Sequence, residues 1–173
     1  ISEKKIFVIY QGIDHTSFYP QLNKKKAIYF KNDVINLMYC GDTNPRKNIS
    51  LIIKAIEILK EKHISVNFLR VGYTWKKREE ELKIVKSESG VDEVYAGTVS
   101  NDILRFHYSC ADVFLWPSVY EGFGYPPLEA LACGCKVVAL DIPINHEILG
   151  DCAIFVKNDA KDFAEGILEA LKT

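Results

Sequence analysis

The chain has 173 residues, of which 48% are hydrophobic, and its 22 basic and 23 acidic side chains give a formal net charge of −1. This length suits one α/β domain and is too short for two full ones, and the composition favours a packed domain over a disordered chain or a fibre. The balanced charge gives no broad attraction to nucleic acid or to an anionic membrane, so no nucleic-acid partner is expected. Any anion must be bound locally.

Cysteine usage and apolar segments indicate the compartment. Five cysteines, an odd number with no Cys-x-x-Cys pair, favour a reduced, cytoplasmic chain. No stretch approaches the roughly 20 apolar residues of a membrane helix, and the opening Ile1 to Lys5 is not a signal peptide. Without an initiator methionine, the chain reads as part of a longer protein. Peripheral docking at the inner face of a membrane through the missing part stays open.

Short β-branched or aromatic runs alternate with amphipathic stretches, which is the pattern of repeated βα units. The runs predict strands at Ile6 to Tyr10, Ile35 to Cys40, Val66 to Val71, Glu93 to Ala96, Val113 to Trp116, Lys136 to Leu140 and Ala153 to Val156. The amphipathic stretches predict helices at Ile49 to Lys62, Lys76 to Ser89, Ser100 to Cys110, Pro126 to Cys133, Asn145 to Leu149 and Asp159 to Leu171. The alternation predicts an α/β fold, a doubly wound parallel sheet with helices on both faces.

Several residues mark where these helices begin and end. Ser100 and Asp159 can cap helix starts, and Pro126 or Pro127 can occupy a first turn, where no amide donor is lost. Gly134 is placed to close the helix that begins near Pro126.

The loop from Gly41 to Asn48 runs from a predicted strand end into a helix start. Arg46 and Lys47 place two cations beside the free amides of that helix, which carry partial positive charge. Such a site suits a diphosphate. A basic pair on a solvated turn is the alternative reading of the same residues.

A second loop, from Trp116 to Pro127, is rich in glycine. Gly122 and Gly124 allow positive φ and remove side-chain bulk, so consecutive amides can face a ligand. Glu121 in this loop and Glu129 in the following helix can place two carboxylates at one cleft, where they could accept hydrogen bonds from sugar or ribose hydroxyls. Taken alone, the pair could equally be the acid and base of a glycoside hydrolase, or a turn carboxylate and a helix-start carboxylate.

A series of short motifs extends over nearly the whole chain. The motifs are Val8 to Asp14, Phe18 to Pro20, Arg46 to Asn48, Ala111 to Ser118, Glu121 to Gly124, Pro127 to Ala130, Gly134 and Glu147 to Asp151. With them the chain resembles glycosyltransferase family four, the group 1 glycosyltransferases, whose Glu-x7-Glu pair is matched by Glu121 and Glu129. So many motifs in order make chance agreement a poor explanation.

The resemblance implies a GT-B architecture of two Rossmann-like domains with the activated sugar bound between them. Residues 1–173 would form the single C-terminal nucleotide-sugar-binding domain, and the N-terminal acceptor domain is absent from this chain. The parent enzyme would be a retaining hexosyltransferase that moves a hexose from a UDP- or GDP-linked donor to a glycan or glycolipid acceptor, in polysaccharide or glycolipid synthesis. The isolated domain is expected to be inactive, because its loops cannot assemble an acceptor site.

The resemblance also implies roles for individual residues. Arg46 and Lys47 would hold the diphosphate, and with Glu121 they form the implied catalytic set. Glu129 would bind the ribose hydroxyls. The implied donor-binding set further contains Gly41, Gly122, Phe123, Gly124 and Leu128, with the segment from Tyr95 to Val99 bordering the base. The amides of Phe123 and Gly124, with Glu121, would hold the donor sugar.

Two positions depart from the commonest family pattern. Many members have asparagine where Gln11 stands and arginine where Asp42 stands. If Asp42 replaces a phosphate-binding arginine, Arg46 must supply that charge, so the role of Arg46 is less secure than that of Lys47.

No Asp-x-Asp pair and no cluster of His, Cys or carboxylates at metal-ligand spacing occurs in the sequence. The expectation is metal-independent transfer without a cofactor, with the nucleotide sugar as donor substrate. Two alternatives remain open: a sugar-nucleotide epimerase or phosphorylase of the same architecture, and a non-catalytic nucleotide-sugar scaffold.

Overall fold

A parallel sheet of six strands lies at the centre of the computed structural model, which describes residues 5–21, 29–75, 91 and 93–172. The strands are β1 (Ile35–Cys40), β2 (Val66–Val71), β3 (Glu93–Gly97), β4 (Val113–Trp116), β5 (Lys136–Leu140) and β6 (Ala153–Val156). Their spatial order is β3-β2-β1-β4-β5-β6. This order confirms the predicted Rossmann-like, doubly wound sheet.

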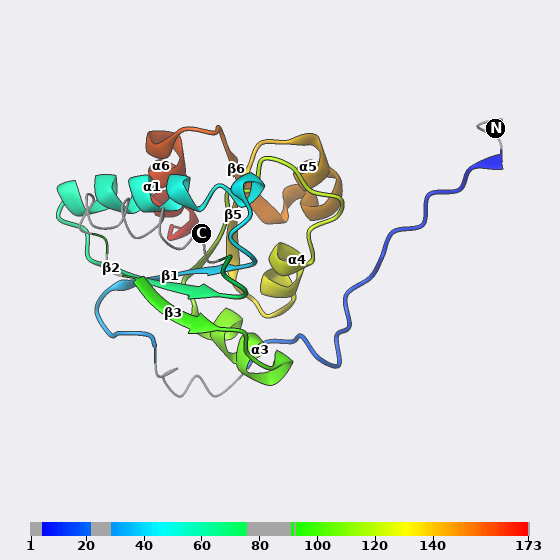
Figure 1. Cartoon of the computed structure of the whole chain (residues 1–173), viewed down its shortest axis with the longest axis horizontal. Coiled ribbons are helices and arrows are strands. Elements are labelled where there is room, and N and C mark those ends of the chain that lie inside the picture. Colours follow the sequence, from blue (N-terminus) through cyan, green and yellow to red (C-terminus); the bar gives the residue numbers. More distant parts are fainter. Residues whose placement is uncertain (1–4, 22–28, 76–90, 92, 173) are drawn as a thin grey trace.

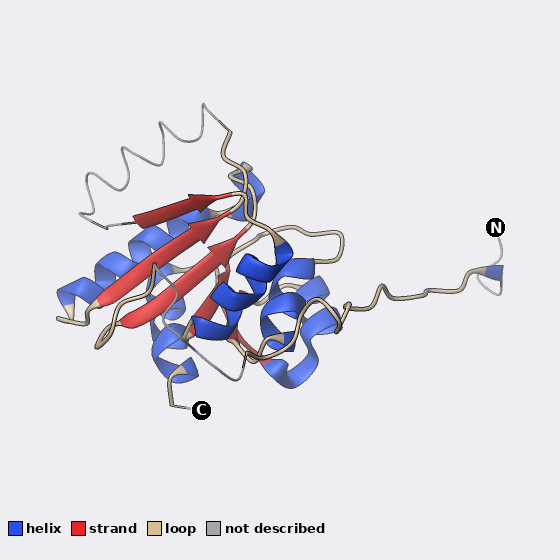
Figure 2. Ribbon diagram, turned by 90° about the horizontal axis from the view of Figure 1, so that it is seen from below, coloured by secondary structure: helices blue, strands red, loops and turns tan. Residues whose placement is uncertain are grey.

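Helices cover both faces of the sheet (Figures 1 and 2). On one face α1 (Ile49–Glu61) packs along α6 (Ala160–Ala170), and on the other α3 (Asn101–Cys110) packs against α4 (Tyr125–Ala132), with α5 (Pro143–Leu149) beside α4. Right-handed crossovers produce this split, because the chain moves toward one edge from β1 to β3 and toward the other edge from β3 to β6. None of the described helices is long and apolar enough to cross a membrane.

Burial on both faces explains why the strands read as continuous apolar runs. Leu37, Met38 and Tyr39 of β1 are fully buried, and so is every residue of β4. The sheet also buries a charged pair: Arg70 of β2 is 2% exposed and pairs with Glu93 on the neighbouring strand β3. The core thus runs through the middle of the sheet and leaves the strand ends for polar chemistry.

Most predicted boundaries are confirmed. β1, β2, β4, β5 and β6 have the predicted bounds, β3 extends one residue further to Gly97, and α5 begins two residues earlier, at Pro143. Asp159 caps α6 by accepting hydrogen bonds from the amides of Lys161 and Asp162, at 2.9 and 3.1 Å. Ser100 occupies the N-cap position of α3 without a side-chain hydrogen bond. The helix predicted from Lys76 to Ser89 lies outside the described residues.

The strand predicted at Ile6 to Tyr10 is wrong. These residues form an extended segment that leads away from the domain (Figure 1), and their side chains are 58–87% exposed. A strand exists only where a neighbour accepts its backbone hydrogen bonds, and none of the six described strands pairs with this segment. The apolar pattern of these residues is therefore not matched by a partner within the described chain.

Candidate functional site

The site predicted from the two loops lies where the strand order reverses. β1 and β4 are neighbours in the sheet, although β2 and β3 separate them in the sequence. The loop after β1 contains the short 3₁₀ helix η2 (Pro45–Lys47), and the glycine-rich loop leaves β4. Ligands of doubly wound sheets bind at the carboxyl ends of the strands at such a switch point.

The loop after β1 is held by its own side chains. Asn44 caps η2 by accepting a hydrogen bond from the Arg46 amide at 3.2 Å, and Asp42 Oδ1 accepts one from the Asn44 amide at 3.0 Å. Asn48 adopts the left-handed conformation, with φ +50°, and connects η2 to α1. Its side chain does not cap α1 and instead bonds Asn158 at 2.9 Å. The predicted helix start beside Arg46 and Lys47 is thus present, and the Asn48 side chain caps none of its first amides.

An ion cluster of Arg46, Lys47 and Glu121 joins the two loops. Nζ of Lys47 lies 2.6 Å from Oε1 of Glu121, and an Arg46 guanidinium nitrogen lies 2.7 Å from Oε2. The Ser118 hydroxyl donates a further hydrogen bond to Oε1. The side chains of Lys47 and Glu121 are only 10% and 7% exposed, whereas that of Arg46 is 39% exposed. The three charges sum to +1 and are partly shielded from water.

Backbone contacts fix the spacing of the loops. The Val119 amide donates to the Arg46 carbonyl oxygen at 2.9 Å, and the Arg46 guanidinium donates to the Tyr120 carbonyl oxygen at 3.0 Å. Below the cluster, Nζ of Lys47 lies 4.5 Å from the centroid of the buried Trp116 ring, within cation–π range. The cluster therefore has a rigid aromatic floor.

The cluster keeps Glu121 ionised. Burial is the largest single influence and raises the pKa of Glu121, but hydrogen bonds from Lys47, Ser118 and Arg46 together outweigh it and lower that pKa. The hydrogen bond to Glu121 also raises the pKa of Arg46. Arg46 thus stays charged beside a carboxylate that is a poor proton acceptor.

Glu129 lies on α4, apart from the ion cluster. The N-cap of α4 is Gly124, whose φ of +100° only glycine adopts readily, and Pro126 and Pro127 occupy the first turn of the helix as predicted. Gly122 does not use the positive φ that a glycine allows. Oε2 of Glu129 accepts a hydrogen bond from the Tyr108 hydroxyl at 3.0 Å. Burial raises the pKa of Glu129, and the Tyr108 hydrogen bond partly offsets this.

Tyr95 and Val99 lie at the far side of the sheet, at the end of the outermost strand β3. Tyr95 is 43% exposed, its hydroxyl donates to the Gly72 carbonyl oxygen at 2.9 Å, and the Arg70 guanidinium lies 4.1 Å from its ring centroid. Val99 is partly buried against the core. The contacts of Tyr95 are thus with β2 and the loop after it rather than with the ion cluster, although both lie at the same end of the sheet.

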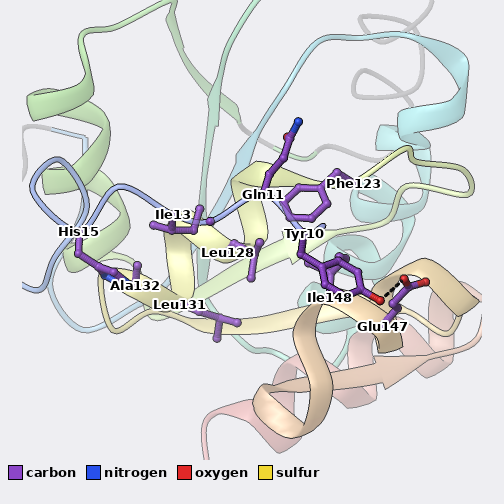
Figure 3. A pocket seen from close by; sticks show the side chains of 11 residues that line it. Tyr10, Gln11, Ile13, His15, Phe123, Leu128, Leu131, Ala132, Glu147 and Ile148 are labelled. Carbon is purple, nitrogen blue, oxygen red and sulfur yellow. Dashed lines mark hydrogen bonds between the residues drawn. The ribbon is translucent and has the colours of Figure 1, made fainter. Parts of the chain in front are cut away.

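A cavity of about 370 Å³ flanks the glycine-rich loop (Figure 3). Phe123, Leu128, Tyr10 and Glu147 of α5 are among the residues that line it. The Tyr10 hydroxyl donates a hydrogen bond to the Glu147 carboxylate at 2.8 Å. Gln11, which also lines it, accepts a hydrogen bond from the Tyr125 hydroxyl. The ion cluster and Glu129 do not line this cavity, so Phe123 and Leu128 border a second space beside the cluster.

A sequence model of glycosyl transferases group 1 matches residues 35–173, which is most of the chain. The chain belongs to the group 1 glycosyltransferases. Among curated relatives, the O-antigen chain mannosyltransferase B of Escherichia coli is 33% identical over 141 residues, covering 78% of this chain and 36% of that protein. The O-antigen chain mannosyltransferase RfbU of Salmonella typhimurium is 32% identical over 160 residues, covering 92% of this chain and 42% of that protein. This glycosyltransferase chain therefore spans less than half the length of these relatives.

Solved structures agree on the fold. A sucrose-phosphate synthase from Thermosynechococcus elongatus superposes with a TM-score of 0.82 at 24% identity, covering 93% of this chain and 42% of that one. Anabaena HepE in complex with UDP and glucose gives 0.84 at 18% identity, covering 96% and 47%. The C-terminal domain of a group 1 glycosyl transferase, LpcC, from Francisella tularensis gives 0.76 at 19%, covering 94% and 89%. The glycosyltransferase chain thus has the Rossmann-like domain fold of GT-B enzymes.

Two residues of this glycosyltransferase site were not singled out from the sequence. Ser118 stands three residues before Glu121 on the same loop, so its proximity could have been read from the spacing. Tyr108 is 21 residues from Glu129 and on another helix, and no local signal connects them. Trp116 is fully buried and stacks on Tyr39 and Phe114.

Proposed function

We propose that this glycosyltransferase chain is the nucleotide-sugar-binding domain of a retaining enzyme that transfers a hexose from a UDP- or GDP-linked donor to a glycan or glycolipid acceptor. The observation that carries the proposal is the ion cluster at the strand-order reversal. Two cations converge there beside the start of α1, where partial positive charge favours an anion.

Lys47 and Arg46 can bind a diphosphate without releasing Glu121. An ammonium has three donors and a guanidinium five, so each cation can keep its contact with the carboxylate and still face phosphate oxygens. In the transfer, the bond between the anomeric carbon and the phosphate oxygen breaks, and negative charge grows on the leaving diphosphate. Cations and helix amides fixed at that point stabilise the transition state more than the ground state.

Glu121 fits an electrostatic and positioning role better than that of a nucleophile. Oε1 already accepts hydrogen bonds from Lys47 and Ser118, and Oε2 accepts one from Arg46, which leaves a weakly basic carboxylate. Its negative charge would support the positive charge that develops on the sugar ring. In the described chain, the amides of Gly122, Phe123 and Gly124 donate no hydrogen bonds and are available for the sugar hydroxyls.

The acceptor site is assigned to another domain of the parent protein. The chain spans only 36% and 42% of the two mannosyltransferases named above, so those proteins have room for a second domain. Their names also favour a mannose donor and a surface-polysaccharide acceptor.

A thermal-shift panel of UDP, GDP, ADP and their sugar conjugates tests the proposal. Ligand at about 100 times its dissociation constant raises stability by about 2.7 kcal/mol, which is a measurable melting shift. We expect one diphosphate family to shift the melt and Lys47→Ala to abolish the shift. Lys54→Ala, at an exposed position of α1, is the matched control and should behave as the wild type. No shift with any nucleotide at millimolar concentration would refute a donor site in this chain.

A further inference from the structure

Tyr108 of α3 makes a partly buried hydrogen bond to Glu129 of α4. The tyrosine is fully buried, and its ring packs edge-on against Phe114 and Phe18, with ring centroids 5.4 and 6.3 Å away. These contacts fix the direction of its hydroxyl, which donates to Oε2 of Glu129 at 3.0 Å. The thiol of Cys40, at the carboxyl end of β1, interacts with the same hydroxyl.

The two oxygens of Glu129 are in different environments. Oε2 is engaged by Tyr108, whereas Oε1 has no hydrogen bond within the described part of the chain and keeps contact with solvent. Without a fixed partner, a glutamate samples many rotamers, and ordering such a side chain on ligand binding costs about 1 kcal/mol or more. A hydrogen bond from a rigid ring removes much of this cost before the ligand arrives.

The hydrogen bond also affects charge. Burial raises the pKa of Glu129, and the bond from Tyr108 acts in the opposite direction and favours the carboxylate. An ionised carboxylate accepts stronger hydrogen bonds from hydroxyls than a protonated one does. The orientation and the charge of Glu129 therefore both depend on the Tyr108 hydroxyl.

We infer that Tyr108 is a positioning residue for the nucleotide: it holds Oε2 of Glu129 so that Oε1 accepts hydrogen bonds from the vicinal hydroxyls of a ribose. The inference rests on the proposed function, because it needs Glu129 at the ribose. Tyr108 itself does not touch the nucleotide.

Calorimetric titration of Tyr108→Phe with three probes tests the inference: the ribonucleotides UDP and GDP, their 2′,3′-dideoxy forms, and inorganic diphosphate. Loss of the hydroxyl should weaken binding of the ribonucleotide about five- to tenfold and leave inorganic diphosphate within about twofold. The preference for ribose over dideoxyribose should shrink by the same factor. Glu129→Gln should show the same pattern, and the double variant should lose little more, because Tyr108 acts on the ribose only through the Glu129 carboxylate.

A stability control separates positioning from packing. Phe163→Leu, in the core on the opposite face of the sheet, lowers stability without reaching Glu129 and should leave the ribose preference unchanged. An equal loss for all three probes in Tyr108→Phe would overturn the inference and leave Tyr108 as a packing residue. If Glu129→Gln alone keeps the ribose preference, the proposed role of Glu129 fails first. If neither UDP nor GDP binds the wild type, the proposed function fails and the inference with it.

Discussion

The Lys47 ammonium lies 2.6 Å from Oε1 of Glu121, although the two residues are 74 positions apart in the sequence. Lys47 lies in the loop after β1 and Glu121 in the loop after β4. Because β1 and β4 are neighbours in the sheet, the two loops lie together. The carboxylate therefore contacts both of the cations that are proposed to bind a diphosphate. Ligand and carboxylate are expected to share the same two cations.

Glu121→Gln should lower stability and strengthen nucleoside diphosphate binding. Removing the charge leaves Lys47 buried beside a neutral amide, which should cost about 2 kcal/mol. The freed cations should bind UDP or GDP a few-fold more tightly, and the melting shift that these ligands produce should be larger than in the wild type. Calorimetry and thermal melting check both parts. Weaker binding than in the wild type would show that Glu121 assists the diphosphate instead.

The contribution of Glu121 to stability should depend on pH. Its folded pKa is lowered from the ordinary value of 4.5, so its stabilising effect is present above that value and is lost as the pH falls through the lower folded pKa. The melting temperature of the wild type should exceed that of Glu121→Gln at pH 6 to 7, and the gap should close as the medium is acidified below about pH 4. A gap that stays constant with pH would rule out the carboxylate as its source.

Glu129→Gln should stabilise the chain at neutral pH while weakening ribonucleotide binding. Burial raises the folded pKa of Glu129 above 4.5, so the protonated form is favoured in the folded state, and this advantage is lost as the pH rises through the folded pKa. A neutral amide avoids that loss and can still accept the Tyr108 hydrogen bond. Melting curves at pH 4 and pH 7 should show a gain only at the higher pH. An equal gain at both would point to packing.

Gly72→Ala should destabilise the site loops, and Gly122→Ala should not. Gly72 has φ +120°, and a Cβ there would overlap the carbonyl oxygen of Gly41, so the two loops would have to separate. A loss of about 2 to 4 kcal/mol is expected, combining backbone strain and steric overlap. Gly122 has open space around a Cβ position. In chemical denaturation, Gly122→Ala should be as stable as the wild type. In calorimetry, the substitution should weaken binding of a nucleotide sugar more than it weakens binding of the free diphosphate.

The isolated chain should transfer no sugar. Incubation with the nucleotide sugar that shifts its melt, together with lipid-linked or free glycan acceptors, should yield neither product nor faster release of diphosphate. The physical reason is that the loops of this domain are proposed to bind the donor alone, whereas an acceptor hydroxyl must be held in line by other groups. Measurable transfer would place an acceptor site within these 173 residues.

The sheet could be predicted almost entirely from the sequence, because strands buried on both faces need apolar side chains at every position. The segment from Ile6 to Tyr10 has the same composition and fails as a strand, because composition does not supply a neighbour. The helix predicted to start at Asn145 starts at Pro143 instead, because proline suits the first turn of a helix.

The sequence by itself determined the α/β class, the two loops that carry the site, and the family, since these depend on local patterns of apolar, glycine and charged residues. Only the tertiary structure decided which atoms meet. It showed that Glu121 bridges Lys47 and Arg46 with the support of Ser118, and that Tyr108 fixes one oxygen of Glu129. The reason is physical: hydrogen bonds and ion pairs depend on distances below about 3.5 Å, and such distances between remote residues follow from the order of the strands and the packing of the helices, which no local pattern encodes.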